Sequence, residues 1–369
     1  MVLRLGLKYY YDFGTMALGK FAAEFMRKRV RIGLIFGGIS PEHDVSICSA
    51  AGVRGSIDAS RFDVWEIYID RQGRMFYGRD LLMKLKDGGK QKFKKLLIDR
   101  LPKMIDVAFP VLHGEGGEDG SIQGFLKTLR IPCVGCGLLA SAVCLDKAVL
   151  NELLVSQGIL KPKCEVLDFQ REGKSICVEK VMRIKRQFKF PLFVKPARTG
   201  SSVGISKVKN GQALSGAIHK ARKFDNKIVV EESVENCLEI EVSVLGGSVN
   251  DYAVSLPGRV LPAAEFYDYA DKYKNNQTGF EVPARLSAGK TKEIQLIALA
   301  AYKIANCTGL ARVDFLLDKK QRVFLNEINT LPGFTPISMY SKLWAASGLS
   351  YSRLITKLIL LAMTEQGKF

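Results

Sequence analysis

The chain of 369 residues is 47% hydrophobic and 25% charged, a composition typical of a folded globular protein that excludes a disordered one. Its 55 Lys and Arg outnumber 37 Asp and Glu, so the net charge is +18. The basic residues are dispersed without a nucleic-acid-binding motif, and no apolar run approaches the roughly 20 residues that cross a bilayer. We therefore expect a cytoplasmic protein with no nucleic-acid and no membrane partner, whose charge would also suit an anionic small substrate.

The first 29 residues differ in character from the rest of the chain. They contain the stretch YYYDFG, the segment TMALGKFAAEFM and the basic cluster RKRVR, and Met26 lies just before the first convincing strand. They lack the uninterrupted apolar core of a signal peptide. We predict that residues 1–29 form an N-terminal extension.

An alternating pattern of strands and helices follows. VRIGLIFGG, residues 30–38, is a nearly continuous apolar strand, and SPEHDVSICSAAGV begins a helix behind a Ser-Pro pair. FDVWEIYID and IDVAFPVLHG supply two further strands. The pattern predicts a parallel, doubly wound sheet over residues 30–135, and ligands of such sheets lie beyond the carboxyl ends of the strands. The candidate residues at those ends are Gly37, Gly38, Glu42 and His113.

The pattern changes from about residue 136. A helix is predicted around LDKAVLNELLVSQG, and short strands such as FPLFVKP and KIVVEE alternate with turns. LEIEVSVLGG, residues 238–247, alternates polar and apolar residues from Glu239 to Val244. We predict mixed α+β structure here, divided into a central unit, residues 136–231, and a C-terminal unit, residues 232–369.

The eight cysteines, at positions 48, 133, 136, 144, 164, 177, 237 and 307, have neither the paired spacing of a disulfide framework nor that of a four-ligand zinc site. Cys133 and Cys136 form a single CxxC, which is a weak metal-binding signal on its own. We expect reduced, mostly buried thiols.

The stretch KPARTGSSVG, residues 195–204, follows the apolar run FPLFV. Its glycines, hydroxyl groups and two positive charges are well suited to hold phosphate. The same residues also favour an ordinary turn between two strands. This stretch alone leaves both interpretations open, because a short motif needs its structural context.

A hairpin is predicted in ARVDFLLDKKQRVFLNEINTLPG, residues 311–333, where two strand-like runs flank the turn KKQR. If the turn is centred between the second Lys and the Gln, Asp314 lies opposite Glu327 and Arg312 lies opposite Asn329. Two facing carboxylates repel each other unless a cation lies between them. Asp, Glu and Asn oxygens without His or Cys favour Mg²⁺, which commonly carries nucleotide phosphates. A solvated polar face is the alternative interpretation.

The sequence contains neither GxxxxGK(S/T) nor GxGxxG, the two commonest nucleotide-binding signatures. A phosphate loop and a magnesium hairpin without them call for a different kind of ATP site. The chain closely resembles the D-alanine-D-alanine ligases of the ATP-grasp superfamily over residues 30 to about 362. The matching blocks are FGGISPEHDVS, LHGEGGEDGSIQG, CVGCGLLASAVCLDK, FVKPARTGSSVG, EFYDYADKY, GLARVDFLL and LNEINTLPGFTPISM. One departure is Asp44, where the family more often has Glu, and residues 1–29 have no counterpart.

This resemblance implies a fold and a reaction. The fold would be α/β and α+β, with an N-terminal parallel doubly wound sheet followed by a two-subdomain ATP-grasp fold. The reaction would join two D-alanines through an acyl phosphate formed from ATP, giving D-alanyl-D-alanine for peptidoglycan precursors. The resemblance also implies a homodimer.

The resemblance further assigns residues to ATP and to its metal ions. The nucleotide-binding residues would be Lys147, Lys195, Glu231, Glu239 and Lys272, with the lysines on the phosphates and the glutamates at adenine and ribose. Asp314, Glu327 and Asn329 would bind two Mg²⁺ ions, for which Mn²⁺ can substitute.

The catalytic residues implied by the resemblance are Glu42, Ser201, Tyr273, Arg312 and Gly333, with His113, Ser338 and Met339 also binding substrate. Glu42 would hold the ammonium group of the first D-alanine, beside His113, and Ser338 with Met339 would hold the second. Arg312 and the Gly333 N–H would stabilise developing negative charge. Ser201 would form hydrogen bonds to Glu42 and Tyr273 and so close the site to water.

Several alternatives accompany these assignments. Glu42 could be an acidic first-turn residue that favours the helix dipole, and His113 a histidine at a strand end. A D-alanine-D-lactate ligase would share the fold, but FYDYADKY resembles the dipeptide-forming members. A biotin-dependent carboxylase is disfavoured because the blocks around Glu42 and His113 match the ligases. A basic nucleic-acid-binding protein would bind with an affinity that falls steeply with salt.

Overall fold

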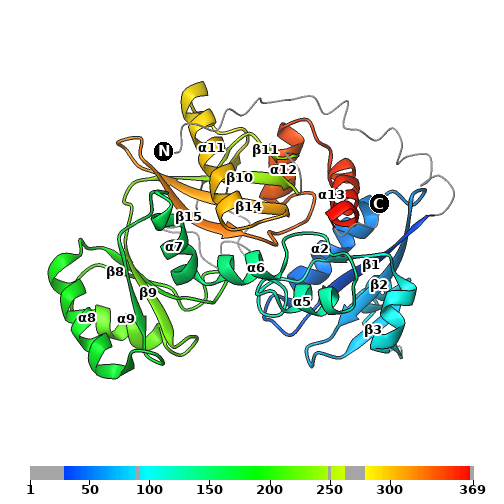
Figure 1. The fold of residues 1–369 in the computed structure, drawn as a ribbon, viewed down its shortest axis with the longest axis horizontal. Helices are drawn as coiled ribbons and strands as arrows, with labels where there is room; N and C mark the ends of the chain where they lie inside the picture. The colour runs from blue at the N-terminus through cyan, green and yellow to red at the C-terminus, as the bar shows by residue number, and fades with distance from the viewer. Residues whose placement is uncertain (1–28, 89–91, 248–250, 262–278, 366–369) are drawn as a thin grey trace.

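Three sheets lie side by side along the molecule (Figure 1). The computed structural model describes residues 29–88, 92–247, 251–261 and 279–365. Lys272, Tyr273 and residues 1–28 of the predicted extension lie outside these ranges. None of the helices within the described ranges has the length and apolar character needed to cross a membrane.

The first sheet has the strand order β4-β3-β2-β1-β5. Its strands are β1 (Val30–Gly37), β2 (Phe62–Ile69), β3 (Met75–Gly78), β4 (Lys94–Lys95) and β5 (Val107–Pro110). As predicted, β1, β2 and β5 are parallel, but β3 and β4 add an antiparallel edge that the sequence did not indicate. The difference arises because β2 turns back through a tight loop at Gly73, whose φ of 77° suits glycine, and does not cross over through a helix.

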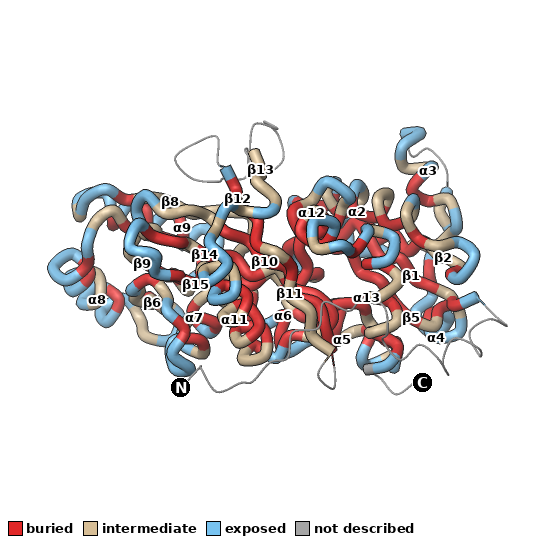
Figure 2. The backbone as a smooth tube through the Cα atoms, turned by 90° about the horizontal axis from the view of Figure 1, so that it is seen from above, coloured by how far each residue is buried: buried red, intermediate tan, exposed pale blue. Residues whose placement is uncertain are grey.

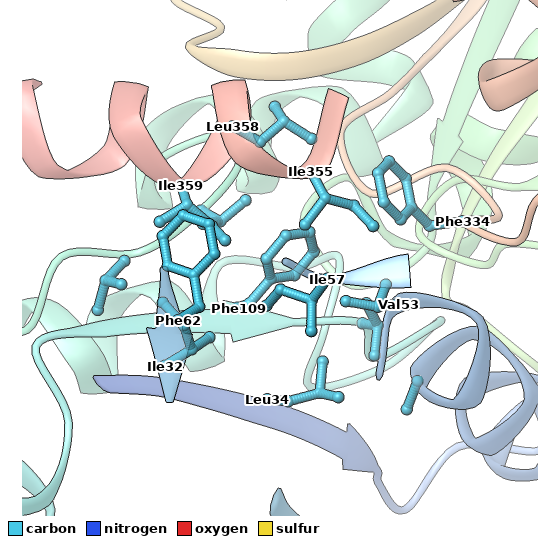
Figure 3. Packing of buried hydrophobic residues seen from close by; sticks show 14 of the residues in the cluster. Ile32, Leu34, Val53, Ile57, Phe62, Phe109, Phe334, Ile355, Leu358 and Ile359 are labelled. Atoms are coloured by element: carbon cyan, nitrogen blue, oxygen red, sulfur yellow. The ribbon is translucent and has the colours of Figure 1, made fainter. Parts of the chain in front are cut away.

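Helices cover both faces of this sheet. One face carries α2 (His43–Ser56), α3 (Leu81–Lys86) and the C-terminal helix α13 (Tyr351–Glu365), and the other carries α4 (Leu101–Met104) and α5 (Ser121–Thr128). Figure 3 shows Ile355 and Ile359 of α13 packed with Phe62 and Phe109 of the sheet. The last helix of the chain therefore completes the core of the first sheet.

The second sheet is antiparallel and has the order β6-β9-β7-β8. Its strands are β6 (Cys164–Asp168), β7 (Leu192–Pro196), β8 (Ser206–Val208) and β9 (Lys227–Glu232), and α8 (Gly173–Gln187) and α9 (Leu214–Ala221) pack on it. Figure 2 shows that α8 exposes much of its surface at this end of the molecule. The predicted strands FPLFVKP and KIVVEE correspond to β7 and β9.

The third sheet is antiparallel, with the order β13-β12-β10-β14-β15 and with β11 paired to β10. Its strands are β10 (Leu238–Gly246), β11 (Ala253–Val254), β12 (Gly258–Leu261), β13 (Gly279–Glu281), β14 (Gly309–Leu317) and β15 (Val323–Asn329). The helices α6 (Leu138–Leu145), α7 (Lys147–Ser156), α11 (Ala288–Ile304) and α12 (Met339–Ala346) surround it. Ile240, Val242 and Val244 of β10 are fully buried in its core, as their alternation predicted.

A close backbone contact joins the first sheet to the third. The Val134 N–H donates to the carbonyl of Ala108 in β5, and the next residue, Gly135, meets Gly309 at the start of β14. Gly309 has a φ of 63°, and a Cβ atom there would lie 2.9 Å from the Gly135 backbone. Cys136 strengthens the junction by donating from Sγ to the carbonyl of Leu310, 3.3 Å away. Glycine at both positions therefore lets the two sheets approach.

Gly309→Ala should destabilise the protein, because the new methyl group meets backbone atoms and the left-handed conformation disfavours a side chain. We expect a cost of about 2 kcal/mol or more and a fall of a few degrees in melting temperature, measured by scanning calorimetry. Gly289→Ala is the matched control, because Gly289 lies in α11 with no atom within 4 Å of its added Cβ. Equal melting temperatures for the two variants would contradict the role of the junction.

Candidate active site

The β14–β15 hairpin has the predicted pairing at its polar residues. Arg312 lies opposite Asn329, and Asp314 lies opposite Glu327. Nearer the turn the register shifts by one residue, because Asn326 is an extra residue on β15 that forms a β-bulge. The turn is therefore centred on the second Lys of KKQR, half a residue from the predicted centre. The extra residue of the bulge offsets this difference, so that Asp314 still lies opposite Glu327.

The bulge also decides which face each side chain of β15 takes. Leu325 before the bulge and Ile328 after it are both buried in the same apolar core, although an odd separation places residues of a regular strand on opposite faces. Glu327 and Asn329 are therefore directed away from this core. In a regular strand they would share the face of Leu325 and point into the core.

The polar face of the hairpin carries a compact group of charges. Arg312 donates from Nε to Asp314 Oδ1 (2.8 Å) and from Nη2 to Oδ2 (2.7 Å), and its Nε lies 3.0 Å from Glu241 Oε2. Burial alone would lower the pKa of Arg312, but the charges of Asp314 and Glu241 raise it well above its ordinary value. The guanidinium is therefore a permanent cation beside the facing carboxylates.

Asn329 connects the two facing carboxylates. Its amide nitrogen lies 2.9 Å from Asp314 Oδ2 and 3.5 Å from Glu327 Oε1, and rotation of the amide would bring its oxygen to the same position. Two carboxylates and an amide are the oxygen donors that Mg²⁺ prefers. No group of three His, Cys, Asp or Glu side chains suited to a metal occurs in the described part of the chain. The protein would thus supply a partial ligand set, which fits a metal that also binds phosphates and water.

Two predicted phosphate-binding lysines approach this hairpin from the second sheet and α7. Lys195, near the end of β7, forms an ion pair with Glu231 of β9. Lys147, the first residue of α7, donates from Nζ to the carbonyl of Thr199 at 2.6 Å. Burial lowers the pKa of Lys147, whereas the negative charge of Glu327 opposes this shift. Lys147 is therefore within electrostatic reach of Glu327, a carboxylate predicted to bind metal, and of Lys195.

Glu239, the other glutamate predicted for nucleotide binding, lies on β10. It is opposite Leu316 of β14, two residues before Glu241 and on the same face of the strand. Glu239 therefore lies at the edge of the charged face of the third sheet, near the start of β10, where the chain arrives from the second sheet.

The stretch KPARTGSSVG joins β7 to β8 as a preformed loop. Arg198 donates from Nε to Asp225 Oδ2 (3.0 Å) and from Nη2 to Oδ1 (2.5 Å) at the base of the loop. Ser201 and Ser202 have positive φ angles of 49° and 59°, which are unfavourable for residues other than glycine. At Gly204, with a φ of 76°, a Cβ would lie 2.6 Å from Phe224. Neighbouring side chains therefore hold the loop in a strained shape.

The tip of this loop reaches the first sheet. The Ser201 hydroxyl donates to Glu42 Oε1, joining residues 159 positions apart. The hydrogen bond predicted between Ser201 and Glu42 is thus present, whereas the third predicted member, Tyr273, lies outside the described residues. Glu42 occupies the N-cap position of α2 but makes no side-chain cap bond, which argues against a capping role for its carboxylate.

His113 follows β5 and is 3% exposed, and Ser40 links it to Glu42, because Ser40 Oγ accepts from the Glu42 N–H and donates to the His113 carbonyl. Its Nε2 is 3.0 Å from Ser49 Oγ, its Nδ1 is 3.9 Å from Glu118 Oε1, and its carbonyl accepts from Ser40 Oγ at 2.6 Å. These contacts fix the histidine at the carboxyl ends of the parallel strands, where ligands of such sheets bind.

Gly333 and Ser338 lie between β15 and α12, and Met339 is the first residue of α12. Ser338 Oγ accepts from the Thr335 N–H at 3.0 Å and lies 2.7 Å from Thr335 Oγ1. A Cβ at Gly333 would lie 3.4 Å from Ser338 Oγ, so the two predicted residues are neighbours. The Met339 side chain, in contrast, is buried with Val260.

Sequence reasoning missed three charged residues of the site. Glu118 lies within the block LHGEGGEDGS and near the loop, since a Cβ at Gly200 would be 3.6 Å from its Oε2. Glu241 contacts Arg312, and its place in the alternating strand was a usable signal. Lys161 lies before β6, and burial lowers its pKa to about 8. Its position in the sequence carries no motif that would have identified it.

Comparison with known proteins adds two matching family models. The model described as D-ala D-ala ligase N-terminus matches residues 31–136, and the model described as D-ala D-ala ligase C-terminus matches residues 153–360. The D-alanine--D-alanine ligase of Clostridium novyi is 42% identical over 353 residues, covering 93% of this chain and 100% of that protein. The ligase of the same name from Clostridium acetobutylicum is 43% identical over 351 residues, with the same coverage of both chains.

Solved structures agree with these matches. VanG D-Ala:D-Ser ligase from Enterococcus faecalis superposes with a TM-score of 0.81 at 34% identity, covering 91% of this chain and 100% of that one. The D-alanine-D-alanine ligase from Coxiella burnetii has a TM-score of 0.77 at 31% identity, with 92% and 95% coverage. The arrangement of the three sheets is therefore shared with these ligases.

Asp225→Ala should loosen the KPARTGSSVG loop, because Asp225 accepts from the Arg198 side chain and backbone N–H and from the Lys227 N–H. The Arg198 pair also keeps the pKa of Asp225 below its ordinary value although burial alone would raise it. We expect trypsin to cut after Arg198 at least about tenfold faster in the variant, as the loss of charge-assisted bonds frees the loop. Mass spectrometry of timed digests measures this rate.

The matched control is Asp58→Ala, which removes a half-buried carboxylate that accepts from the Ser60 N–H and hydroxyl in its own turn, away from the loop. Its cleavage rate after Arg198 should equal that of the unmodified protein. A cleavage rate in Asp225→Ala equal to that in Asp58→Ala would show that other contacts hold the loop.

Proposed function

Because the chain belongs to the D-alanine-D-alanine ligase family, we propose that it joins two D-alanine molecules into D-alanyl-D-alanine while ATP is converted to ADP and phosphate. The observation that carries the proposal is the match of nearly the whole chain, at 42% identity, to a relative of that name. Peptide bond formation between free amino acids in water is unfavourable, so coupling to ATP is chemically required. The site's residues support this chemistry.

The nucleotide would lie between the second and third sheets. Lys147 and Lys195 would hold its phosphates, with Lys272 as a further contact, and Glu231 and Glu239 would hold adenine and ribose. Asp314, Glu327 and Asn329 would hold two Mg²⁺ ions, which would neutralise the negative charge of the phosphates. Phosphoryl transfer needs positioning and charge neutralisation more than covalent participation by the protein, and these side chains are of the types that supply both.

The first D-alanine would bind at the carboxyl ends of the first sheet. Glu42, only 7% exposed, would hold its ammonium group, and His113 would lie beside it. Arg312 would stabilise negative charge on the transferred phosphate and on the tetrahedral oxyanion, helped by the Gly333 N–H. Ser338 and Met339 would help to place the second D-alanine, whose amine attacks the acyl phosphate.

The loop tip would exclude water from the reaction. The Ser201 bond to Glu42 supports a closed arrangement in which the loop covers the phosphates, and Tyr273 would complete the bridge. Exclusion of water protects an acyl phosphate from hydrolysis. We further propose that the protein works as a homodimer in the cytoplasm, where ATP is available, and that its product enters peptidoglycan precursors.

D-serine is a second candidate for the attacking substrate, because VanG D-Ala:D-Ser ligase is 34% identical and superposes well. D-lactate is less favoured, since EFYDYADKY resembles the dipeptide-forming members. Both substrates can be compared directly with D-alanine.

The test incubates the protein with ATP, Mg²⁺ and D-alanine and measures ADP, phosphate and dipeptide by coupled assay and mass spectrometry. Parallel reactions add D-serine or D-lactate, replace D-alanine by L-alanine, remove Mg²⁺ with EDTA, or add RNA. We expect one D-alanyl-D-alanine per ADP, dependent on Mg²⁺ and unaffected by RNA. Absence of dipeptide, or preferential formation of a D-lactate ester, would overturn the proposal.

Ser201→Ala should lower kcat/KM for D-alanine by about tenfold or more and raise the ADP formed per dipeptide. The reason is that a hydrogen bond to a carboxylate contributes about 1.5–3 kcal/mol, and about 1.4 kcal/mol corresponds to a factor of ten. Ser201→Gly separates this bond from backbone strain, because it removes the hydroxyl while relaxing the positive φ. Ser206→Ala, in β8, is the control. An unchanged amount of ADP per dipeptide in both Ser201 variants would show that closure of the loop depends on the phosphate contacts alone.

A further inference from the structure

Lys161 is a charged residue next to the site to which nothing above gives a role. It precedes β6 and lies beside β15, where its Nζ donates to the carbonyl of Asn326 at 2.8 Å. The preceding residue, Leu160, accepts a hydrogen bond from the Leu325 N–H at 2.9 Å. Leu160 and Lys161 therefore form hydrogen bonds to two successive residues of β15, Leu325 and Asn326, at the bulge.

The partner of Lys161 is the bulged residue itself. In a bulge the extra residue is left out of the regular ladder, so its backbone groups need other partners. Asn326 lies between Leu325, which is fully buried, and Glu327, which faces the site. The ammonium group of Lys161 thus satisfies a carbonyl that the hairpin leaves out of its ladder.

The charge of Lys161 acts on the same site. The residue as a whole is only partly buried, yet burial lowers the pKa of its ammonium group to about 8, with the charge of Lys195 acting in the same direction. The carboxylates of Glu231 and Glu327 oppose that shift. The amine is therefore within electrostatic reach of a proposed nucleotide-binding residue and a proposed metal-binding residue.

We propose that Lys161 is a positioning residue that fixes the Asn326 bulge and thereby presents Glu327 beside Asp314 for Mg²⁺-dependent nucleotide binding. This inference rests on the proposed function. The bulge decides whether Glu327 faces the site or the apolar core, so the group that holds the bulge sets the geometry of the metal ligands. Lys161 acts through the backbone of its neighbour and needs no contact with the substrate.

Lys161→Met tests the proposal, because it keeps most of the apolar stem and removes the donor and the charge. Calorimetric titration with ADP, in Mg²⁺ and in EDTA, measures the gain in affinity that Mg²⁺ provides without any turnover. We expect this gain to fall by about tenfold or more, since the freed carbonyl no longer holds the bulge. The affinity for ADP in EDTA should change much less.

Three further variants separate the possible outcomes. Lys163→Met is the matched control, because exposed Lys163 donates to the carbonyl of Gln187 outside the site, and it should keep the full gain. Lys161→Arg keeps a charged donor and should retain a larger gain than Lys161→Met. If the Met variant does not fold, Lys161→Gln replaces it, and a gain equal to that of the unmodified protein would overturn the proposal.

Glu327→Gln distinguishes failure of this inference from failure of the proposed function. If Glu327→Gln loses the Mg²⁺-dependent gain while Lys161→Met keeps it, the metal site stands and the positioning role of Lys161 is wrong. If Glu327→Gln also keeps the full gain, the metal assignment is wrong and the positioning role falls with it. Loss in Glu327→Gln and Lys161→Met, but not in Lys163→Met, supports both.

Discussion

Compensation of buried charge is the constraint on which the site depends. An unpaired charge in a protein interior costs several kcal/mol, so each buried charged side chain needs a partner of opposite sign. Carboxylates and cations balance in the described part of the site, which draws on the second and third sheets, α7 and the segment before β6. The carboxylates are Glu231, Glu241, Asp314 and Glu327, and the cations are Lys147, Lys161, Lys195 and Arg312. A nucleotide would add several negative charges to a group that is already balanced. Divalent cations that bind together with the phosphates would neutralise this added negative charge, which is why the proposed function requires them.

The same site depends on how the sheets are joined. The first and third sheets are in close contact, since Gly135 and Gly309 meet backbone to backbone and α13 of the C-terminal part packs on the first sheet. The second sheet reaches the first through the tip of one loop, where Ser201 contacts Glu42. The first and third sheets are thus joined through packed backbone, whereas the second sheet meets the first through side chains at a loop tip, which can open without separating the other two sheets.

Much of the fold and the site could be predicted from the sequence, because alternation and turn position carry the information. The pairing of Asp314 with Glu327 followed from the hairpin pattern, and the Ser201 bond to Glu42 followed from a resemblance across distant blocks. The bulge was missed, although the interval from Leu325 to Ile328 in VFLNEIN breaks the alternation of apolar residues. Lys161 could not have been found in this way, since its role depends on a backbone carbonyl 165 residues away. The antiparallel edge of the first sheet was missed because β3 and β4 are too short to show a period.

The departures from regular structure gather at this one site. β15 carries a bulge, the loop after β7 has adjacent positive φ angles at Ser201 and Ser202, and Lys161 is desolvated. Each departure is unfavourable by itself and persists because neighbouring groups hold it, as the Lys161 ammonium does for the bulge and Asp225 does for the loop. A regular β15 would direct Glu327 into the apolar core, and a relaxed loop would withdraw the Ser201 hydroxyl from Glu42. These irregularities therefore bring the proposed metal-binding face of the third sheet and the proposed substrate-binding end of the first sheet close together.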